Sequence, residues 1–213
     1  MTRGPGRREP GGAAWLNLGV KATLLGLIVL YLAQPELPQF EGKAMLFRSA
    51  VYPLLAVLVP AIWLLRGRPT PYPHLADALL VLPMVIDSAG NALDAYDYEW
   101  FGPVIHGVNI AILVVCFSLL LFVVFADQPL ARTVTIGLAV GLASVLHVVW
   151  ELLEWGGNVL LDTNLDITYA TTMRNLGLGL VGMALGALVA APLLVRRPEL
   201  GSPLFRRAAL RPG

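Results

Sequence analysis

The sequence is poor in cysteine and in charged residues, and both shortages exclude whole classes of protein. Cys116 is the only cysteine among 213 residues, so a secreted scaffold held together by disulfides is excluded. Charged residues make up 14% of the chain, against roughly a quarter in a typical soluble domain. With a net charge of +1 and no basic stretch interleaved with aromatics, the chain is not expected to bind nucleic acid.

Apolar residues are abundant instead, at 57% of the chain, and they gather in long runs. That fraction is too high for one soluble core of this size, and it excludes a disordered protein. A helix that crosses a bilayer needs about 20 predominantly apolar residues. We therefore predict an all-α, polytopic membrane protein with six transmembrane helices, at residues 13–33, 49–65, 75–96, 103–126, 133–155 and 176–195.

The distribution of Lys and Arg predicts the orientation of these helices. Basic residues are enriched on the cytoplasmic side of a membrane. Here eleven Lys and Arg residues lie on the side of the membrane that carries the two tails, and three lie on the other side. Both termini are therefore predicted to be cytoplasmic. We divide the chain into a disordered basic tail (1–12), a membrane domain (13–195) and a second basic tail (196–213). The tails either only fix this topology or also attract anionic lipids.

Two of the predicted helices carry polar residues at i, i+4, i+7 spacing, which places three side chains on one helix face. We therefore predict a polar pocket toward the outer leaflet, built from Asp87, Asn91 and Asp94 on the third helix, His106 and Asn109 on the fourth, and His147, Glu151 and Glu154 on the fifth. If the third and fifth helices touch, an outer layer would hold Asp94, His106 and Glu154. Asp87 and His147 would then lie roughly 10 Å deeper.

This concentration of ionisable groups favours a function, because each costs at least about 2.5 to 3.5 kcal/mol at the bilayer centre. Imidazole and carboxylate ligands suit Zn, Mn or Fe, and the metal-ligand candidates are His106, His147, Glu151 and Asp87. The acid/base candidates are Glu154 and Asp94, and Asn91, Asn109 and Asp166 are the further polar residues of the pocket. The first hypothesis is a divalent metal bound by a membrane-embedded enzyme or by a metal-handling protein.

Three alternatives stay open. Chains of Asp, Glu and His mark proton relays, so the protein could be a proton- or cation-coupled transporter, with Asp77 continuing the path toward the inner face. Against this, the predicted polar cluster contains no Lys or Arg. The second predicted helix has no ionisable residue, and the first has only Lys21, whose side chain can snorkel to the headgroups. The second alternative is metal-free acid/base chemistry on a lipid, and the third is a structural or assembly subunit.

Two further features concern packing and access. Gly137 and Gly141 are four residues apart, as are Gly182 and Gly186, and this spacing lets helix backbones approach closely. The connection at 159–174 is long for a helix hairpin, and it either covers the polar pocket or is an ordinary solvated loop.

The fifth helix contains the motif Trp150-Glu151-Leu152-Leu153-Glu154-Trp155, and the chain before it contains Tyr96-Asp97 and then His106. Together these features resemble the YjdF-like family of bacterial inner-membrane proteins over about residues 77–186. The resemblance implies a multi-pass protein of the bacterial cytoplasmic membrane with its important residues at these positions, and it implies no particular reaction. The sequence departs from the family pattern before the last helix, where the family carries two carboxylates. Residues 171–175 occupy that place without them; alternatively, residues 162–166 supply the two carboxylates from a shifted position.

Overall fold

The computed structural model describes residues 11–68, 71–126, 128–161, 163 and 168–195. Over these residues the chain is all-helical, which confirms the predicted fold class. The helices are α1 (Gly12–Ala33), α2 (Met45–Leu65), α3 (His74–Ala92), α4 (Phe101–Val124), α5 (Arg132–Leu161) and α6 (Tyr169–Val195), with short 3-10 turns η1 (Pro38–Phe40) and η2 (Ala95–Asp97). All six α-helices of the described chain are long and apolar enough to cross a membrane.

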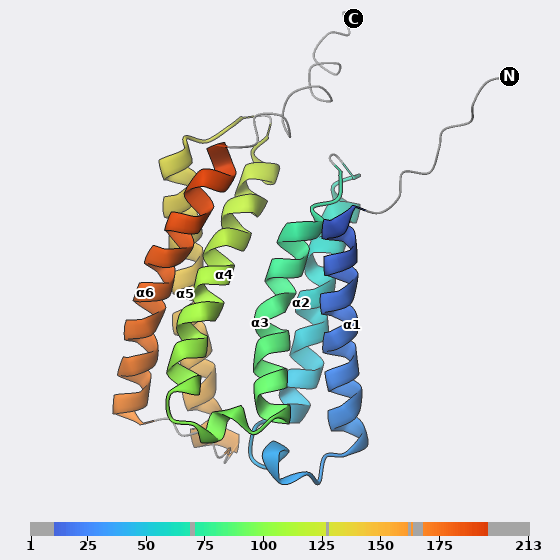
Figure 1. The fold of residues 1–213 in the computed structure, drawn as a ribbon, viewed down its shortest axis with the longest axis vertical. Helices are drawn as coiled ribbons and strands as arrows, with labels where there is room; N and C mark the ends of the chain where they lie inside the picture. Colours follow the sequence, from blue (N-terminus) through green and yellow to red (C-terminus); the bar gives the residue numbers. More distant parts are fainter. Residues whose placement is uncertain (1–10, 69–70, 127, 162, 164–167, 196–213) are drawn as a thin grey trace, which may run out of the picture.

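The helices form two groups of three that stand side by side, α1 to α3 and α4 to α6 (Figure 1). Within the second group α4 packs closely on α6, and α3 joins the groups because it packs on both α1 and α4. We call the end of the bundle that carries Gly12 and Val195 the tail end, and the opposite end, with η1 and η2, the far end (Figure 1).

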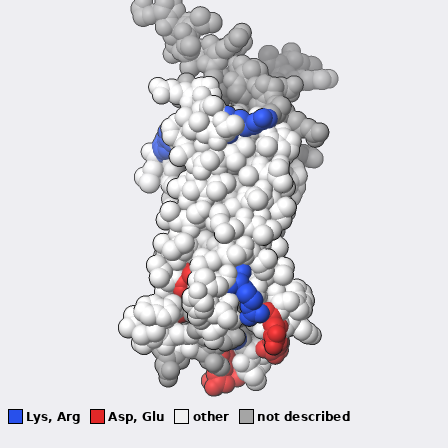
Figure 2. Space-filling model, turned by 90° about the vertical axis from the view of Figure 1, so that its left-hand side faces the viewer, with Lys and Arg blue, Asp and Glu red and all other residues white. Residues whose placement is uncertain are grey.

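The surface of the bundle matches a lipid environment. Large apolar side chains are exposed along the middle of the helices, among them Leu25, Leu58, Leu142 and Leu185. On the face drawn in Figure 2, charged residues lie toward the two ends and leave an uncharged band between them, and the acidic ones gather at the far end. The protein is therefore a multi-pass membrane protein whose solvent is the bilayer.

Close approach of α4 and α6 depends on glycine. A Cβ atom added to Gly182 would collide with the backbone of Gly107, and one added to Gly186 would lie 2.7 Å from the carbonyl oxygen of Ala111. The small-residue prediction is thus confirmed for this pair of glycines. It is wrong for Gly137 and Gly141, which have no described atom within 4 Å of such a Cβ.

Four helix boundaries differ from the predictions by four residues or more. Helix α5 ends at Leu161 rather than at residue 155, and α6 begins at Tyr169 rather than at residue 176, so the connection between them is shorter than the predicted 159–174. The other two differences matter for the site. Helix α2 begins at Met45 rather than at residue 49, so Arg48 lies on the helix and not in a loop. Helix α3 ends at Ala92 rather than at residue 96, because the chain turns into the left-handed conformation at Asp94, with φ at 53°. The two predicted tails fall almost entirely outside the described residues.

Helix α5 is unusually long. Its 30 residues correspond to about 45 Å, whereas the hydrocarbon core of a bilayer is roughly 30 Å thick. Apart from Arg132 at its first position, its ionisable residues, His147, Glu151 and Glu154, all lie in the half toward the far end, which agrees with a helix whose last turns leave the apolar layer.

Candidate functional site

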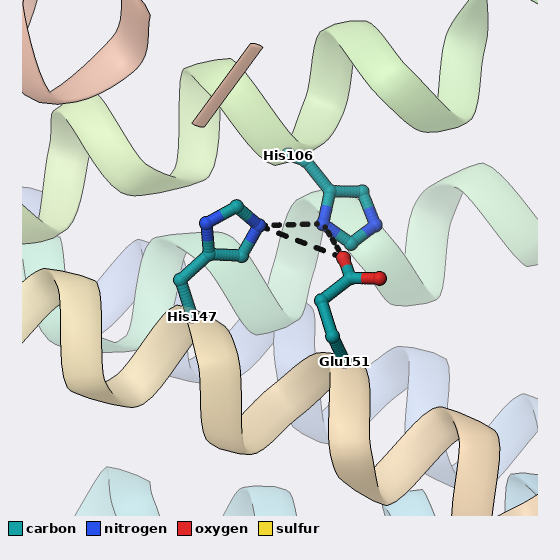
Figure 3. A group of neighbouring side chains, drawn as sticks. All are labelled: His106, His147 and Glu151. Atoms are coloured by element: carbon teal, nitrogen blue, oxygen red, sulfur yellow. Dashed lines mark hydrogen bonds and ion pairs between the residues drawn. The ribbon is translucent and has the colours of Figure 1, made fainter. Parts of the chain in front are cut away.

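Two histidines and a glutamate meet between α4 and α5 near the far end (Figure 3). Nδ1 of His106 lies 3.3 Å from Nε2 of His147, and Oε1 of Glu151 lies 3.0 Å from the first nitrogen and 3.5 Å from the second. His147 and Glu151 are buried, and His106 is half-buried. The three potential ligand atoms therefore surround one small volume.

Local sequence explains how these side chains converge. His147 and Glu151 are one helical turn apart on α5, so they share a face, and His106 reaches them from the antiparallel neighbour α4. The imidazole of His147 is backed by α6, where a Cβ added to Gly179 would collide with the ring. Glycine at this position thus allows the ring to lie directly against the backbone of α6.

The carboxylate of Glu151 is the least satisfied charge of the site. Both of its oxygens are buried, and neither accepts a hydrogen bond from any described residue, although Oε1 is only 3.0 Å from His106. Buried carboxylates are normally paired or hydrogen-bonded, because an unpaired one loses its hydration without compensation. Oε1 of Glu151 lies close to nitrogens of His106 and His147 but accepts no hydrogen bond from them. This arrangement suits three ligand atoms that point at a common cation.

A second polar group lies beside the first and is centred on Asp87. Its Oδ2 accepts hydrogen bonds from Arg48 Nη1 and, at 2.6 Å, from the Tyr52 hydroxyl, and its Oδ1 accepts one from Tyr96 at 2.8 Å. Burial and the negative charge of Asp87 raise the pKa of Tyr96, so this phenol stays protonated and donates. Asp87 is therefore fully bonded, and the structure does not bring it into the group of candidate metal ligands.

Arg48 is the residue that the sequence interpretation missed. The second predicted helix begins at residue 49, which leaves Arg48 in a loop, and the polar cluster is predicted to contain no Lys or Arg. In the structure it is 5% exposed, pairs with Asp87, and holds Nη2 3.9 Å from Oε1 of Glu154. Its spacing from Tyr52, four residues on, is the signal that could have revealed it, because Nη1 of Arg48 donates to that hydroxyl at 3.0 Å.

The other predicted pocket residues are spread over different surroundings. Asp94 lies beyond the end of α3, is exposed, and is not on the face that carries Asp87. Asn91 is buried and donates to the backbone carbonyl of Asp87 at 2.9 Å. The Oδ1 atom of Asn109 is buried without a described partner, and Asp166 falls outside the described residues.

The predicted layers need correction because α3 and α5 do not pack closely. The structure inserts α4 between them, with α3 on one side and α5 on the other. The link between the two polar groups is Arg48, which reaches Asp87 on α3 and Glu154 on α5. Arg48 also stacks over Trp150 of α5, with 5.6 Å from the guanidinium carbon to the ring centre.

Two cavities border the site. One has a volume of about 100 Å³, is lined mainly by apolar side chains, and lies between the two helix groups. The other has a volume of about 280 Å³, is lined mainly by polar side chains, and includes residues of the far-end connections. Tyr96, His106 and Glu154 line both cavities.

A separate buried ion pair lies near the tail end. Oδ2 of Asp77 accepts from Lys21 at 2.6 Å, from Asn17 at 2.8 Å and from the Tyr72 hydroxyl at 2.5 Å. The snorkelling predicted for Lys21 is thus wrong, since its ammonium binds a carboxylate inside the bundle. Burial and the hydrogen bond to Asp77 raise the pKa of Tyr72, which keeps it a donor. His74 stacks on Tyr72 beside this group, with ring centres 4.7 Å apart.

Comparisons with protein-family models, with curated proteins and with solved structures give no match. The resemblance to the YjdF-like family therefore stays a prediction, and the chemistry of the site has to be argued from its own residues.

Proposed function

We propose that this membrane protein binds a divalent transition metal through His106, His147 and Glu151. The observation that supports it is the set of ligand separations, 3.3, 3.0 and 3.5 Å. A tetrahedral ion with bonds of about 2.0 to 2.1 Å holds its ligand atoms about 3.3 to 3.4 Å apart. Two imidazoles and one carboxylate suit Zn, and also Mn or Fe.

Three protein ligands fit a working metal better than a structural one. Structural zinc sites are closed by four protein ligands, whereas catalytic sites use three, often two His and one Glu, and keep one position for water or substrate. Glu154 is the acid/base candidate, because it lies one turn from Glu151 and lines both cavities. We therefore favour a membrane-embedded metalloenzyme over a protein that only handles metal.

The proposal places the metal on the outer side of a bacterial cytoplasmic membrane. It rests on the excess of basic residues at the tail end, which favours cytoplasmic termini. The site lies at the far end, so it would face away from the cytoplasm.

A transporter is less well supported. A proton path across the membrane would need an acidic group near the tail end, and Asp77 lies there. Its carboxylate, however, is already bound by Lys21, Asn17 and Tyr72. Fully buried apolar residues, Val81 on α3 and Val114 on α4, lie in the clusters that fill the bundle between the two ends. A charge would have to cross this layer without polar partners.

Metal content of the purified protein tests the proposal. Protein extracted in mild detergent is stripped of metal, dialysed against Zn, Mn or Fe(II) and analysed by mass spectrometry of the elements. We expect about one ion per chain for the preferred metal, and a loss of at least about tenfold in affinity for Glu151→Gln and for His147→Ala.

Matched controls separate a specific site from surface binding. His74→Ala removes an imidazole, and Glu99→Gln removes an exposed carboxylate of the far end; both variants should keep the ion. Wild-type protein that retains less than roughly a tenth of an ion after reconstitution with each metal would refute the proposal.

A further inference from the structure

The polarity of the interior changes sharply at the candidate metal ligands. Beside His106 and Glu154 lie the mainly apolar cavity of about 100 Å³ and the mainly polar cavity of about 280 Å³. Both residues line both cavities, so the two spaces adjoin there. An elongated ligand that occupied both would need an apolar part and a polar part, with their junction beside these two side chains.

The apolar cavity borders the bilayer. It lies between α2, which contributes Leu55, and α5, which contributes Leu146 and Trp150. These two helices do not pack closely along their length, and their contact includes the rings of Tyr52 and Trp150, whose centres are 6.4 Å apart. Leu146 is 37% exposed on the bundle surface. A hydrocarbon chain therefore has a route from the membrane into this space.

The polar cavity offers cations that are not neutralised by neighbours. Lys43 and Arg174 line it, and neither forms an ion pair with a described residue, whereas Arg48 is held by Asp87 and Glu154. Glu99 also lines the cavity, and it too has no ion pair among the described side chains. Two cations without an ion pair among the described residues, Lys43 and Arg174, therefore line this cavity, and cations of this kind form charge-assisted hydrogen bonds with a phosphate group.

We propose that the two cavities bind a phosphate-bearing acyl lipid, with the part of its acyl chain nearest the head group in the apolar cavity, the rest of the chain in the bilayer, and its phosphate near Lys43 and Arg174. The junction of head and chain, where such lipids carry their ester groups, would lie beside His106 and Glu154. As an assignment of the substrate of the metal site, this inference rests on the proposed function. The binding of the lipid itself does not, because neither cavity needs the ion.

Photo-labelling tests the binding. The protein is reconstituted in phosphatidylcholine vesicles that contain a small fraction of phosphatidic acid with a diazirine on its acyl chain, and labelled residues are located by peptide mass spectrometry. We expect labels on Ile110 and Leu113, which line the apolar cavity and are buried, at a level comparable to lipid-facing Leu185 and Leu188. Diacylglycerol with the same photoreactive chain, which lacks the phosphate, should label the cavity residues at least about fivefold less.

Variants distinguish specific binding from general contact with membrane lipid. Lys43→Ala combined with Arg174→Ala should reduce cavity labelling by phosphatidic acid to the diacylglycerol level, while Arg66→Ala combined with Arg132→Ala, which removes two cations at the tail end, should not. Leu55→Trp, at a half-buried position of the cavity wall, should reduce cavity labelling by both probes. Labelling of Leu185 and Leu188 should stay constant throughout and shows that each variant is inserted.

Absence of labels on Ile110 and Leu113, or equal labelling of them by both probes, overturns the inference. The same measurement on metal-depleted protein and on Glu151→Gln should give unchanged cavity labelling. Failure of the lipid inference therefore appears as a metal-binding protein without cavity labels, and failure of the metal proposal as cavity labels without bound metal.

Discussion

The two ends of the bundle each bury an ion pair built to the same plan, yet they differ in what surrounds it. At the tail end Asp77 of α3 binds Lys21 of α1, and at the far end Asp87 of α3 binds Arg48 of α2. In both, a tyrosine hydroxyl adds a hydrogen bond to the same carboxylate oxygen. None of the residues of the tail-end pair lines any of the three cavities found at the far end.

The far end carries more than its ion pair requires. Beyond Arg48 and Asp87 it holds a carboxylate whose oxygens accept no hydrogen bond from the described residues, two histidines in contact, and two adjoining cavities. A carboxylate that only joins helices needs hydrogen-bond donors, and at the tail end one oxygen of Asp77, Oδ2, accepts three hydrogen bonds, although Oδ1 of Asp77 and Oδ1 of Asn17 have no partner among the described residues. Glu151 differs from Asp77 in that neither of its oxygens accepts a hydrogen bond from the described residues, and four experiments can test whether this difference marks a functional site.

The largest effect is expected from Arg48→Leu. It leaves Asp87 as a buried charge without a cation, and breaking a buried pair in this way costs about 3 to 5 kcal/mol. The free energy of unfolding, measured by denaturant titration in detergent, should fall by that amount. Arg48→Leu combined with Asp87→Asn should recover at least half of the loss, because position 87 then carries no unpaired charge. A loss below roughly 1 kcal/mol for the single variant would mean that water reaches Asp87.

Neutralising one acidic residue at each end is expected to have different effects on the free energy of unfolding. Asp77→Asn removes the negative charge that pairs with Lys21 and weakens the hydrogen bonds from Asn17 and Tyr72, so it should lower the free energy of unfolding by about 1 to 3 kcal/mol. Glu151→Gln removes a buried charge whose oxygens accept no hydrogen bond from the described residues, so metal-free protein should be equally stable or more stable. The same denaturant titration, run in parallel on both variants without metal, compares them. Equal destabilisation by both would mean that this difference does not mark a functional site.

A smaller effect is expected from Gly179→Ala on α6. The added methyl group would meet the imidazole of His147 and displace it from its two neighbours, so metal affinity should fall roughly tenfold. Gly177→Ala, on the same helix with no described atom near the added methyl group, is the matched control. Competition titration with a metal indicator measures both. Identical affinities for the two variants would show that the position of the His147 ring does not determine binding.

The smallest effect is expected from Asp94→Asn. Asp94 is exposed beyond the end of α3, and asparagine tolerates its left-handed backbone equally well. Both the free energy of unfolding, within about 0.5 kcal/mol, and the metal content should be unchanged. A lost ion in this variant would restore Asp94 to the site and revive the layered arrangement.

The sequence predicted the six spans well because each is a continuous apolar run, and this signal does not depend on tertiary contacts. It predicted the faces of α5 equally well, since His147 and Glu151 meet through helical spacing alone. His106 was found as well, because a loop of a few residues forces α4 to run beside α3 and places its first turns at the same end.

The partners of the carboxylates could not be predicted in the same way. Arg48 and Lys21 were assigned to water or headgroups by their distance from the nearest helix end, but each binds an acid that is distant in sequence. Tyr96 is the last residue of the third predicted helix, but in the structure it lies in η2, beyond the end of α3, and donates to Asp87. The prediction that Asp94 shares a helix face with Asp87 was wrong, because the spacing of polar residues does not reveal where the backbone leaves the helix.

The length of α5 decides from which compartment an ion could reach its ligands. Counted from Arg132, Glu151 lies roughly 30 Å along the helix, which is the full thickness of the hydrocarbon layer. A metal held there would stand at one water boundary and nearly a whole bilayer away from the other. It would exchange with the solution on one face of a sealed vesicle only, and a membrane-impermeant chelator would remove it from that face alone.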